Sequence, residues 1–153
     1  MVTGPMAHAR ARANPADGKP PVRRAAGVVA VVFLLLGLLG FLPGVTSDFQ
    51  ALRFAGHHSD AMLFGALQVS VLHNLIHLLT GVAGLILART ATGARAFLVG
   101  GGTFYLVLWL YGVVVDRDSG ANFLPLNPAD DWLHLGLGIV MLASGLLSAR
   151  SHR

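Results

Sequence analysis

The sequence contains no cysteine and few charged residues. Without cysteine, the 153-residue chain has no disulfide, no thiolate metal ligand and no cysteine nucleophile. Charged side chains make up 12% of the residues, about half of the roughly one quarter that is typical of soluble domains. Hydrophobic residues make up 54%, so too few polar side chains remain to cover a globular surface. The composition therefore indicates a single domain whose solvent is lipid.

Four hydrophobic segments of spanning length follow one another along the chain. About 20 apolar residues cross a bilayer core, and a soluble bundle would need a polar stripe on each helix, which these segments lack. Before the last segment, Asn127 suits an N-cap and Pro128 suits the first helical position. The sequence therefore predicts an all-α integral membrane four-helix bundle, with helices at about 25–42, 64–88, 96–115 and 132–149.

The two ends of the chain differ from the hydrophobic segments. Residues 1–24 mix proline, glycine, alanine and charge without an apolar period, which predicts a disordered cytoplasmic tail. The membrane domain is expected at 25–150 and a second cytoplasmic tail at 151–153. A signal peptide is the alternative for the first hydrophobic segment, but no small-x-small cleavage motif follows it. A retained helix is therefore favoured.

The basic residues are distributed unequally between the two sides of a four-span arrangement. With the N-terminus inside, nine fall on the inner side and two, Arg53 and Arg117, on the outer side. This positive-inside bias predicts a multi-pass protein of the cell membrane with both termini in the cytoplasm (N-in/C-in). The expected partner is the lipid bilayer. Nucleic acid is not expected as a partner, because the basic residues are scattered and form no continuous basic face. The inner basic residues are Arg10, Arg12, Lys19, Arg23, Arg24, Arg89, Arg95, Arg150 and Arg153.

The connections between the segments differ in length. Residues 89–95 form a short inner turn, which makes the second and third helices antiparallel neighbours. The outer connections, at about 43–63 and 116–131, are longer and contain apolar residues such as Phe49 and Leu124. We expect both to fold back onto the helices, the first as a short interfacial helix or as a hydrophobic cap.

Two motifs lie at the outer ends of the second and fourth helices. They read HNLIHLL from His73 and NPADDWLHL from Asn127. With these motifs, the chain from about Arg24 to Arg150 resembles a bacterial membrane family called domain of unknown function 4383. The resemblance implies a four-helix membrane protein of GC-rich bacteria, and it implies no activity.

Histidines and small residues share one face of each of these two helices. His73 and His77 are four residues apart and lie on one face, and His134 begins a similar face in the fourth helix. Small residues mark close packing between membrane helices. We therefore expect two tandem helical hairpins in which the second and fourth helices pack through these faces, with their histidines at similar depth. The candidates for helix packing and polar contacts are Gly81, Gly84, Gly138, Gly145, Asn74 and Asp131.

The histidines allow three interpretations. In the first they are polar glue, hydrogen-bonded to neighbouring helices, and no cofactor is bound. In the second, His73, His77 and His134 hold a transition-metal ion. In the third, His77 and His134 hold haem b between the helices. Further metal ligands are available in Asp130 and Asp131, and in His57, His58 and Asp60 if the first outer connection folds over the helices.

No set of catalytic groups accompanies the histidines. Ser70 lies three residues before His73, but the pair has no G-x-S-x-G elbow and no oxyanion hole. Charged residues in mid-helix, which mark transport paths, are lacking. The sequence therefore predicts no enzyme. It predicts a small multi-pass membrane protein of unassigned role, acting as a structural or accessory component, a partner subunit or a homo-oligomer; the alternative is a metal- or haem-binding membrane protein.

The inner turn at residues 89–95 provides a test of the topology. A reporter that is active only in the cytoplasm is expected to be active when fused within this turn, because the flanking arginines keep the turn inside. The measurement compares cytoplasmic and periplasmic reporters at the same position. A periplasmic signal from this turn contradicts the predicted topology.

Overall fold

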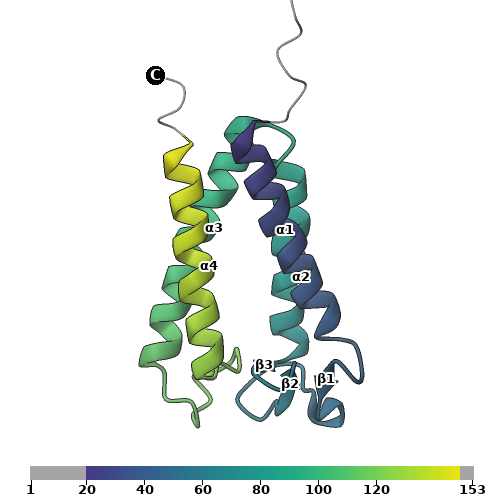
Figure 1. The fold of residues 1–153 in the computed structure, drawn as a ribbon. Coiled ribbons are helices and arrows are strands. Elements are labelled where there is room, and N and C mark those ends of the chain that lie inside the picture. Colours follow the sequence, from purple (N-terminus) through teal and green to yellow (C-terminus); the bar gives the residue numbers. More distant parts are fainter. Residues whose placement is uncertain (1–19, 149–153) are drawn as a thin grey trace, which may run out of the picture.

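The computed structural model describes residues 20–148, which form four helices and a small sheet (Figure 1). The helices are α1 (Pro21–Leu39), α2 (Val71–Leu87), α3 (Ala91–Val114) and α4 (Pro128–Leu147). Of these, α1, α3 and α4 are long and apolar enough to cross a membrane, and α2 is a shorter apolar helix of 17 residues. The fold is thus a helical bundle in which three helices are long and apolar enough to cross a membrane.

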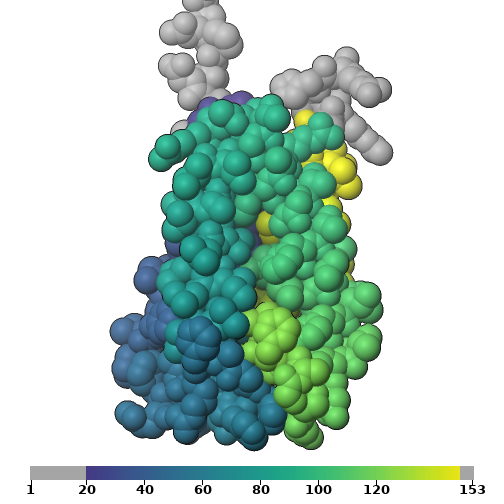
Figure 2. Space-filling model, turned by 180° about the vertical axis from the view of Figure 1, so that it is seen from behind, coloured from purple at the N-terminus to yellow at the C-terminus, as the bar shows by residue number. Residues whose placement is uncertain are grey.

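The helices pack as two hairpins. α1 lies against α2, and α3 lies against α4, while smaller contacts join α1 and α2 to α3. Figure 1 shows the two pairs, with the short turn between α2 and α3 at the end where α1 begins. Seen from behind, α2 and α3 lie side by side (Figure 2). This arrangement agrees with the predicted pair of tandem hairpins.

The second helix does not begin at the predicted residue, Phe64. Phe64 and Gly65 both have positive φ, 54° and 67°, and they turn the chain between two short strands. The helix begins at Val71 instead, where the Ser70 hydroxyl accepts a hydrogen bond from the His73 amide. A serine N-cap of this kind satisfies one of the free amides of the first turn, so it fixes the start of α2.

The other three helices, unlike α2, begin earlier than predicted. α1 begins at Pro21, inside the expected tail 1–24, because proline suits the first helical turn. α4 begins at Pro128 rather than at Trp132, because Asn127 and Asp130 form a capping box, and α3 begins at Ala91 rather than at 96. The predicted ends, at 42, 88, 115 and 149, differ from the observed ones by three residues or fewer. The expected tail 151–153, like residues 1–19, lies outside the described residues.

A small cap, residues 43–69, covers one end of the first hairpin. Its strands β1 (Thr46–Ser47), β2 (Ala61–Leu63) and β3 (Leu67–Val69) form an antiparallel sheet in that order, and the 3-10 helix η1 (Phe49–Ala51) follows β1. Ala61, Leu63 and Val69 are buried and pack against Leu36 and Leu39 of α1. The first long connection is therefore a hydrophobic cap, which is one of its two predicted forms.

The small-residue faces of α2 and α4 do not pack against each other. A Cβ atom added at Gly81 would lie 2.8 Å from a backbone oxygen of α1, and one at Gly138 would lie 3.1 Å from a backbone oxygen of α3. Gly84 likewise faces α1 and α3, and Gly145 faces α3. The prediction that α2 and α4 pack through these faces is wrong. The small residues of each helix mainly contact the other helix of the same hairpin instead.

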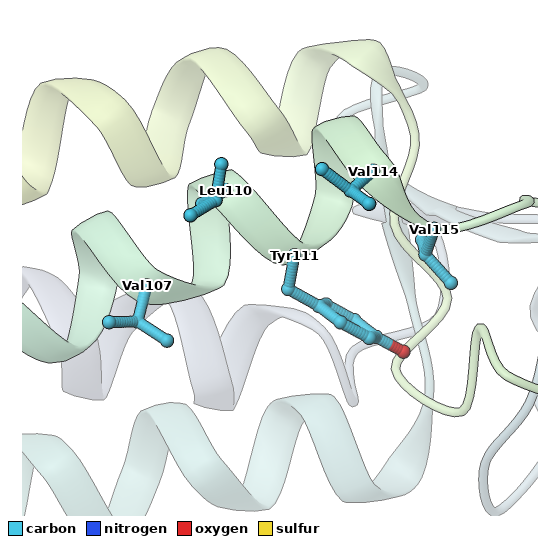
Figure 3. Close-up of a pocket in the computed structure, with 5 residues that line it drawn as sticks. All are labelled: Val107, Leu110, Tyr111, Val114 and Val115. Atoms are coloured by element: carbon cyan, nitrogen blue, oxygen red, sulfur yellow. The ribbon is translucent and has the colours of Figure 1, made fainter.

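Apolar side chains cover the outside of the helices. Figure 3 shows one such surface at the end of α3, a shallow hollow of about 430 Å³ whose lining is apolar. The ring of Tyr111 lies beside the hollow, and its hydroxyl points to the following loop, where it donates a hydrogen bond to the Ala121 carbonyl. Such a surface suits contact with lipid. Its other lining residues are Val107, Leu110, Val114 and Val115.

We expect Gly102→Ala to destabilise the protein and Gly100→Ala to leave it intact. A Cβ atom at Gly102 would lie 2.8 Å from the Leu142 backbone nitrogen and 3.0 Å from the Gly138 carbonyl oxygen, so α3 and α4 must separate. Overpacking of this kind costs about 1–3 kcal/mol. Gly100 is on the same helix, and nothing lies within 4 Å of its Cβ position. Thermal unfolding of both variants in one detergent makes the comparison, and equal midpoints contradict the expectation.

Candidate functional site: a buried histidine cluster

Three histidines from two helices face the interior of the protein. The N-cap residue Ser70 fixes where α2 begins, and the first turns of α2 carry His73 and His77. The capping box fixes where α4 begins, and its second turn carries His134. All three residues are buried, with 3% or less of each exposed. These residues, here called the histidine cluster, lie at the cap end of the helices.

The rings of the cluster lie close together. The ring centroids of His73 and His77 are 4.7 Å apart, those of His73 and His134 are 5.8 Å apart, and those of His77 and His134 are 6.5 Å apart. One ring nitrogen from each histidine lies within 4.8 Å of the other two. The expectation that the histidines meet at similar depth is thus confirmed, although the helix faces around them pack elsewhere.

Five of the six imidazole nitrogens of the cluster have no hydrogen-bond partner among the residues that the structure describes. These nitrogens are Nδ1 of all three histidines and Nε2 of His77 and His134. A buried polar atom without a partner costs about 1–3 kcal/mol. The polar-glue interpretation requires hydrogen bonds from these rings to neighbouring helices, and the described residues provide none for these five atoms.

Asn74 lies apart from the cluster, in the contact between α1 and α2. A Cβ atom added at Gly40 would overlap the Asn74 side-chain amide, and one at Gly37 would lie 2.7 Å from the Asn74 carbonyl oxygen. The two glycines therefore allow α1 to approach the start of α2 closely. Asn74 has the expected packing role, but against α1 rather than α4.

Two aromatic rings form a floor beneath the cluster. Phe33 of α1 and Tyr105 of α3 are fully buried and stack with centroids 4.7 Å apart. The Phe33 centroid is 5.8 Å from that of His77, and the Tyr105 centroid is 5.5 Å from that of His134. The Tyr105 hydroxyl is directed towards Thr80 without a hydrogen bond of normal geometry. Below this floor the buried side chains are apolar, including Phe97, Leu98 and Met141.

An acidic side chain lies on the other side of the cluster, towards the cap end. Asp131 precedes His134 by three residues on the same face of α4. Its Oδ2 accepts a hydrogen bond from Nη2 of Arg117 at 2.7 Å, while Oδ1 is buried without a partner in the described part of the chain. A Cβ atom added at Gly112 of α3 would overlap this Oδ1 atom. The polar groups thus continue from the cluster towards the loop that carries Arg117.

The other predicted ligands do not join the cluster. Asp130 is engaged elsewhere, since its Oδ2 accepts hydrogen bonds from the backbone amides of Gln68 and Asn127. His57, His58 and Asp60 are in the cap, and the described residues contain one group with metal-binding geometry, which does not include them. The centroids of the His57 and His58 rings are 3.9 Å apart.

Three residues of the site were not predicted from the sequence: Phe33, Tyr105 and Arg117. Nothing in the sequence distinguishes Phe33 from the other apolar residues of its segment. Arg117 was counted only as one of the two basic residues on the outer side. Tyr105 carried the one usable signal, because a tyrosine in mid-helix lies far from the interfaces where tyrosines of membrane proteins gather.

Comparison with known proteins gives one match. Residues 23–147 match a family model described as Domain of unknown function (DUF4383). This range includes the whole histidine cluster, Tyr105 and Asp131. No curated protein and no solved structure matches the chain.

We expect His77→Leu to stabilise the protein in the presence of a chelator. Leucine has a similar volume and removes two buried nitrogens that have no partner, so the free energy of unfolding rises by about 1–2 kcal/mol. Thermal unfolding in detergent measures the change. His58→Leu, in the exposed part of the cap, is the control and leaves the midpoint unchanged. A lower midpoint for His77→Leu contradicts the expectation.

Proposed function

The chain belongs to the family described as Domain of unknown function (DUF4383), whose description assigns no activity, and we propose that it is a membrane protein that binds a transition-metal ion between His73, His77 and His134. One observation carries this proposal: a ring nitrogen of each histidine lies within 4.8 Å of the other two. A metal ion would give one nitrogen of each ring a partner, where five of the cluster's nitrogens lack one among the described residues.

The spacing of the nitrogens suits a coordinated ion. Metal–nitrogen bonds of about 2.0 Å in tetrahedral geometry separate the ligand atoms by about 3.3 Å. The nitrogens lie within 4.8 Å of one another, so they must approach by about 1.5 Å or less to reach that spacing.

The ligand atoms define the class of ion. Imidazole nitrogen suits zinc, copper, nickel and iron, whereas Ca²⁺ and Mg²⁺ prefer oxygen ligands. The cluster consists of three imidazoles, and the chain has no cysteine. Three protein ligands leave a fourth position on a tetrahedral ion open to water or to another group. We therefore propose a first-row ion of the zinc or copper type.

Haem fits the site less well than a single ion. A haem held by His77 and His134 would need a flat space between the two rings. The His73 ring occupies this region, since its centroid is 4.7 Å from that of His77 and 5.8 Å from that of His134. Tyr105 adds a second buried ring beside His134.

The aromatic floor supports binding rather than passage through the chain. Phe33 and Tyr105 stack beneath the histidines, and apolar side chains fill the interior beyond them. A dehydrated cation would find no polar partner there, and a charge without partners is costly in an apolar interior. We therefore propose a site with one open side, towards the cap end.

We further propose that all four helices cross the membrane. α2 has 17 residues and a length of about 25 Å, which is at the lower end of the range for a span, and it lies against α1. With the basic residues inside, both termini are cytoplasmic, and the cap and the histidine cluster belong to the outer half of the protein. This topology supports an ion that arrives from outside the cell.

Full-length protein in detergent is expected to bind one Co²⁺ per chain, and Zn²⁺ is expected to displace it. The visible absorption of Co²⁺ reports tetrahedral coordination, and a titration gives the dissociation constant. Alanine in place of His73, His77 or His134 removes one of three bonds to the ion, so each variant is expected to bind at least about tenfold more weakly. His57→Ala and His58→Ala, in the cap, are matched controls and retain the wild-type affinity.

The proposal fails if the wild-type protein takes up none of Co²⁺, Zn²⁺, Cu²⁺ and Ni²⁺, or if the cap variants lose as much affinity as the cluster variants. The histidines then belong to a structural or accessory membrane protein, which acts with a partner subunit or a second copy of itself.

A further inference from the structure

We infer that the ion reaches the histidine cluster by way of the Asp131 carboxylate, and that Arg117 competes with the ion for this carboxylate. The inference rests on the proposed metal binding and adds to it a route and a competing cation. It follows from the position of the two side chains, from the Asp131 oxygen that lacks a partner among the described residues and from the stacked rings on the other side of the cluster.

Asp131 lies close to the cluster along α4 and contacts a half-exposed side chain. It lies one helical turn from His134 on the same face of α4, on the side of the cap. The Asp131 side chain is 8% exposed, while the Arg117 side chain that contacts it is 44% exposed. The pair therefore connects a half-exposed guanidinium to a buried carboxylate that precedes His134 by three residues on α4.

One oxygen of Asp131 has no hydrogen-bond partner among the described residues. Oδ2 is bound by Arg117, but Oδ1 is buried and has no partner in the described part of the chain. A dication that leaves water loses hydration free energy, and neutral imidazoles carry no negative charge that would offset this loss. A carboxylate beside the path offsets part of that loss, so Asp131 lowers the barrier to entry.

Arg117 competes with the incoming ion for the same carboxylate. An ion pair with a half-exposed partner is weak, typically about 0–1 kcal/mol, so the guanidinium can return to solvent when a dication arrives. While Arg117 stays in place, its positive charge repels cations from the Asp131 carboxylate. A dication thus reaches the site by displacing the Arg117 guanidinium from the Asp131 carboxylate.

The neighbouring carboxylate is not suited to this role. Asp130 holds two backbone amides, those of Gln68 and Asn127, through its Oδ2 atom. Releasing it would break the capping box of α4 and the link to β3. Phe33 and Tyr105 stack on the inner side of the cluster, whereas Asp131 offers a carboxylate on the side of the cap.

Stopped-flow mixing of Co²⁺ with full-length protein in detergent tests this route. Asp131→Asn is expected to lower the association rate about tenfold, and Asp131→Glu, which keeps the charge, is expected to restore most of it. Arg117→Gln is expected to raise the rate severalfold, because the competing cation is gone. Asp118→Asn and Arg53→Gln make the same charge changes at exposed positions in the α3–α4 loop and in the cap, and they keep the wild-type rate.

The outcomes separate this inference from the proposed function. An unchanged association rate in Asp131→Asn overturns the entry role while Co²⁺ binding by the wild type still stands. Equal effects of Asp118→Asn and Asp131→Asn overturn it too, because the charge then acts without regard to position. A wild-type protein that binds no ion removes the site and its entry route together. Far-UV circular dichroism and the Co²⁺ bound at saturation show whether each variant is folded.

Discussion

Three imidazole rings packed inside an apolar interior set the demands on the rest of the fold. Five of their nitrogens lack partners among the described residues, so the cluster opposes folding unless packing elsewhere compensates for it. The close contacts between helices supply that packing. Gly37 and Gly40 bring α1 against the start of α2, and Gly102 and Gly138 bring α3 against α4. The glycines therefore support the histidines indirectly, by holding each hairpin tightly together.

The cap fixes how the two hairpins meet at the cluster. The Asp130 carboxylate accepts a hydrogen bond from the Gln68 amide at 3.1 Å, and the Asn127 side chain donates one to the Ala66 carbonyl at 2.7 Å. Both bonds join the start of α4 to the segment just before α2. Because His73 and His134 lie within two turns of these helix starts, the same bonds hold their rings at one level. A capping box thus positions the site as well as beginning a helix.

Local patterns predicted the helices and the shared face of His73 and His77, because hydrophobic length and the helical period are properties of a short stretch of chain. Which helix each face contacts is not a property of a short stretch of chain. A glycine such as Gly81 indicates that some helix comes close, but it does not identify that helix, and α1 rather than α4 is the neighbour. The turn at Phe64 depends on a positive φ that phenylalanine rarely adopts. The Arg117–Asp131 pair and the Phe33–Tyr105 stack join distant segments, which one sequence cannot align.

The cluster is divided between the two halves of the protein, with two rings on the first hairpin and one on the second. Neither half carries the three-histidine set by itself, so under the proposed metal binding the capture of an ion would require correct joining of the two halves. An ion held there acts as a cross-link between halves that otherwise meet mainly through α3, and its binding free energy adds to the free energy of assembly. The fraction of protein with an ion bound would then measure how much of it has its two hairpins correctly assembled.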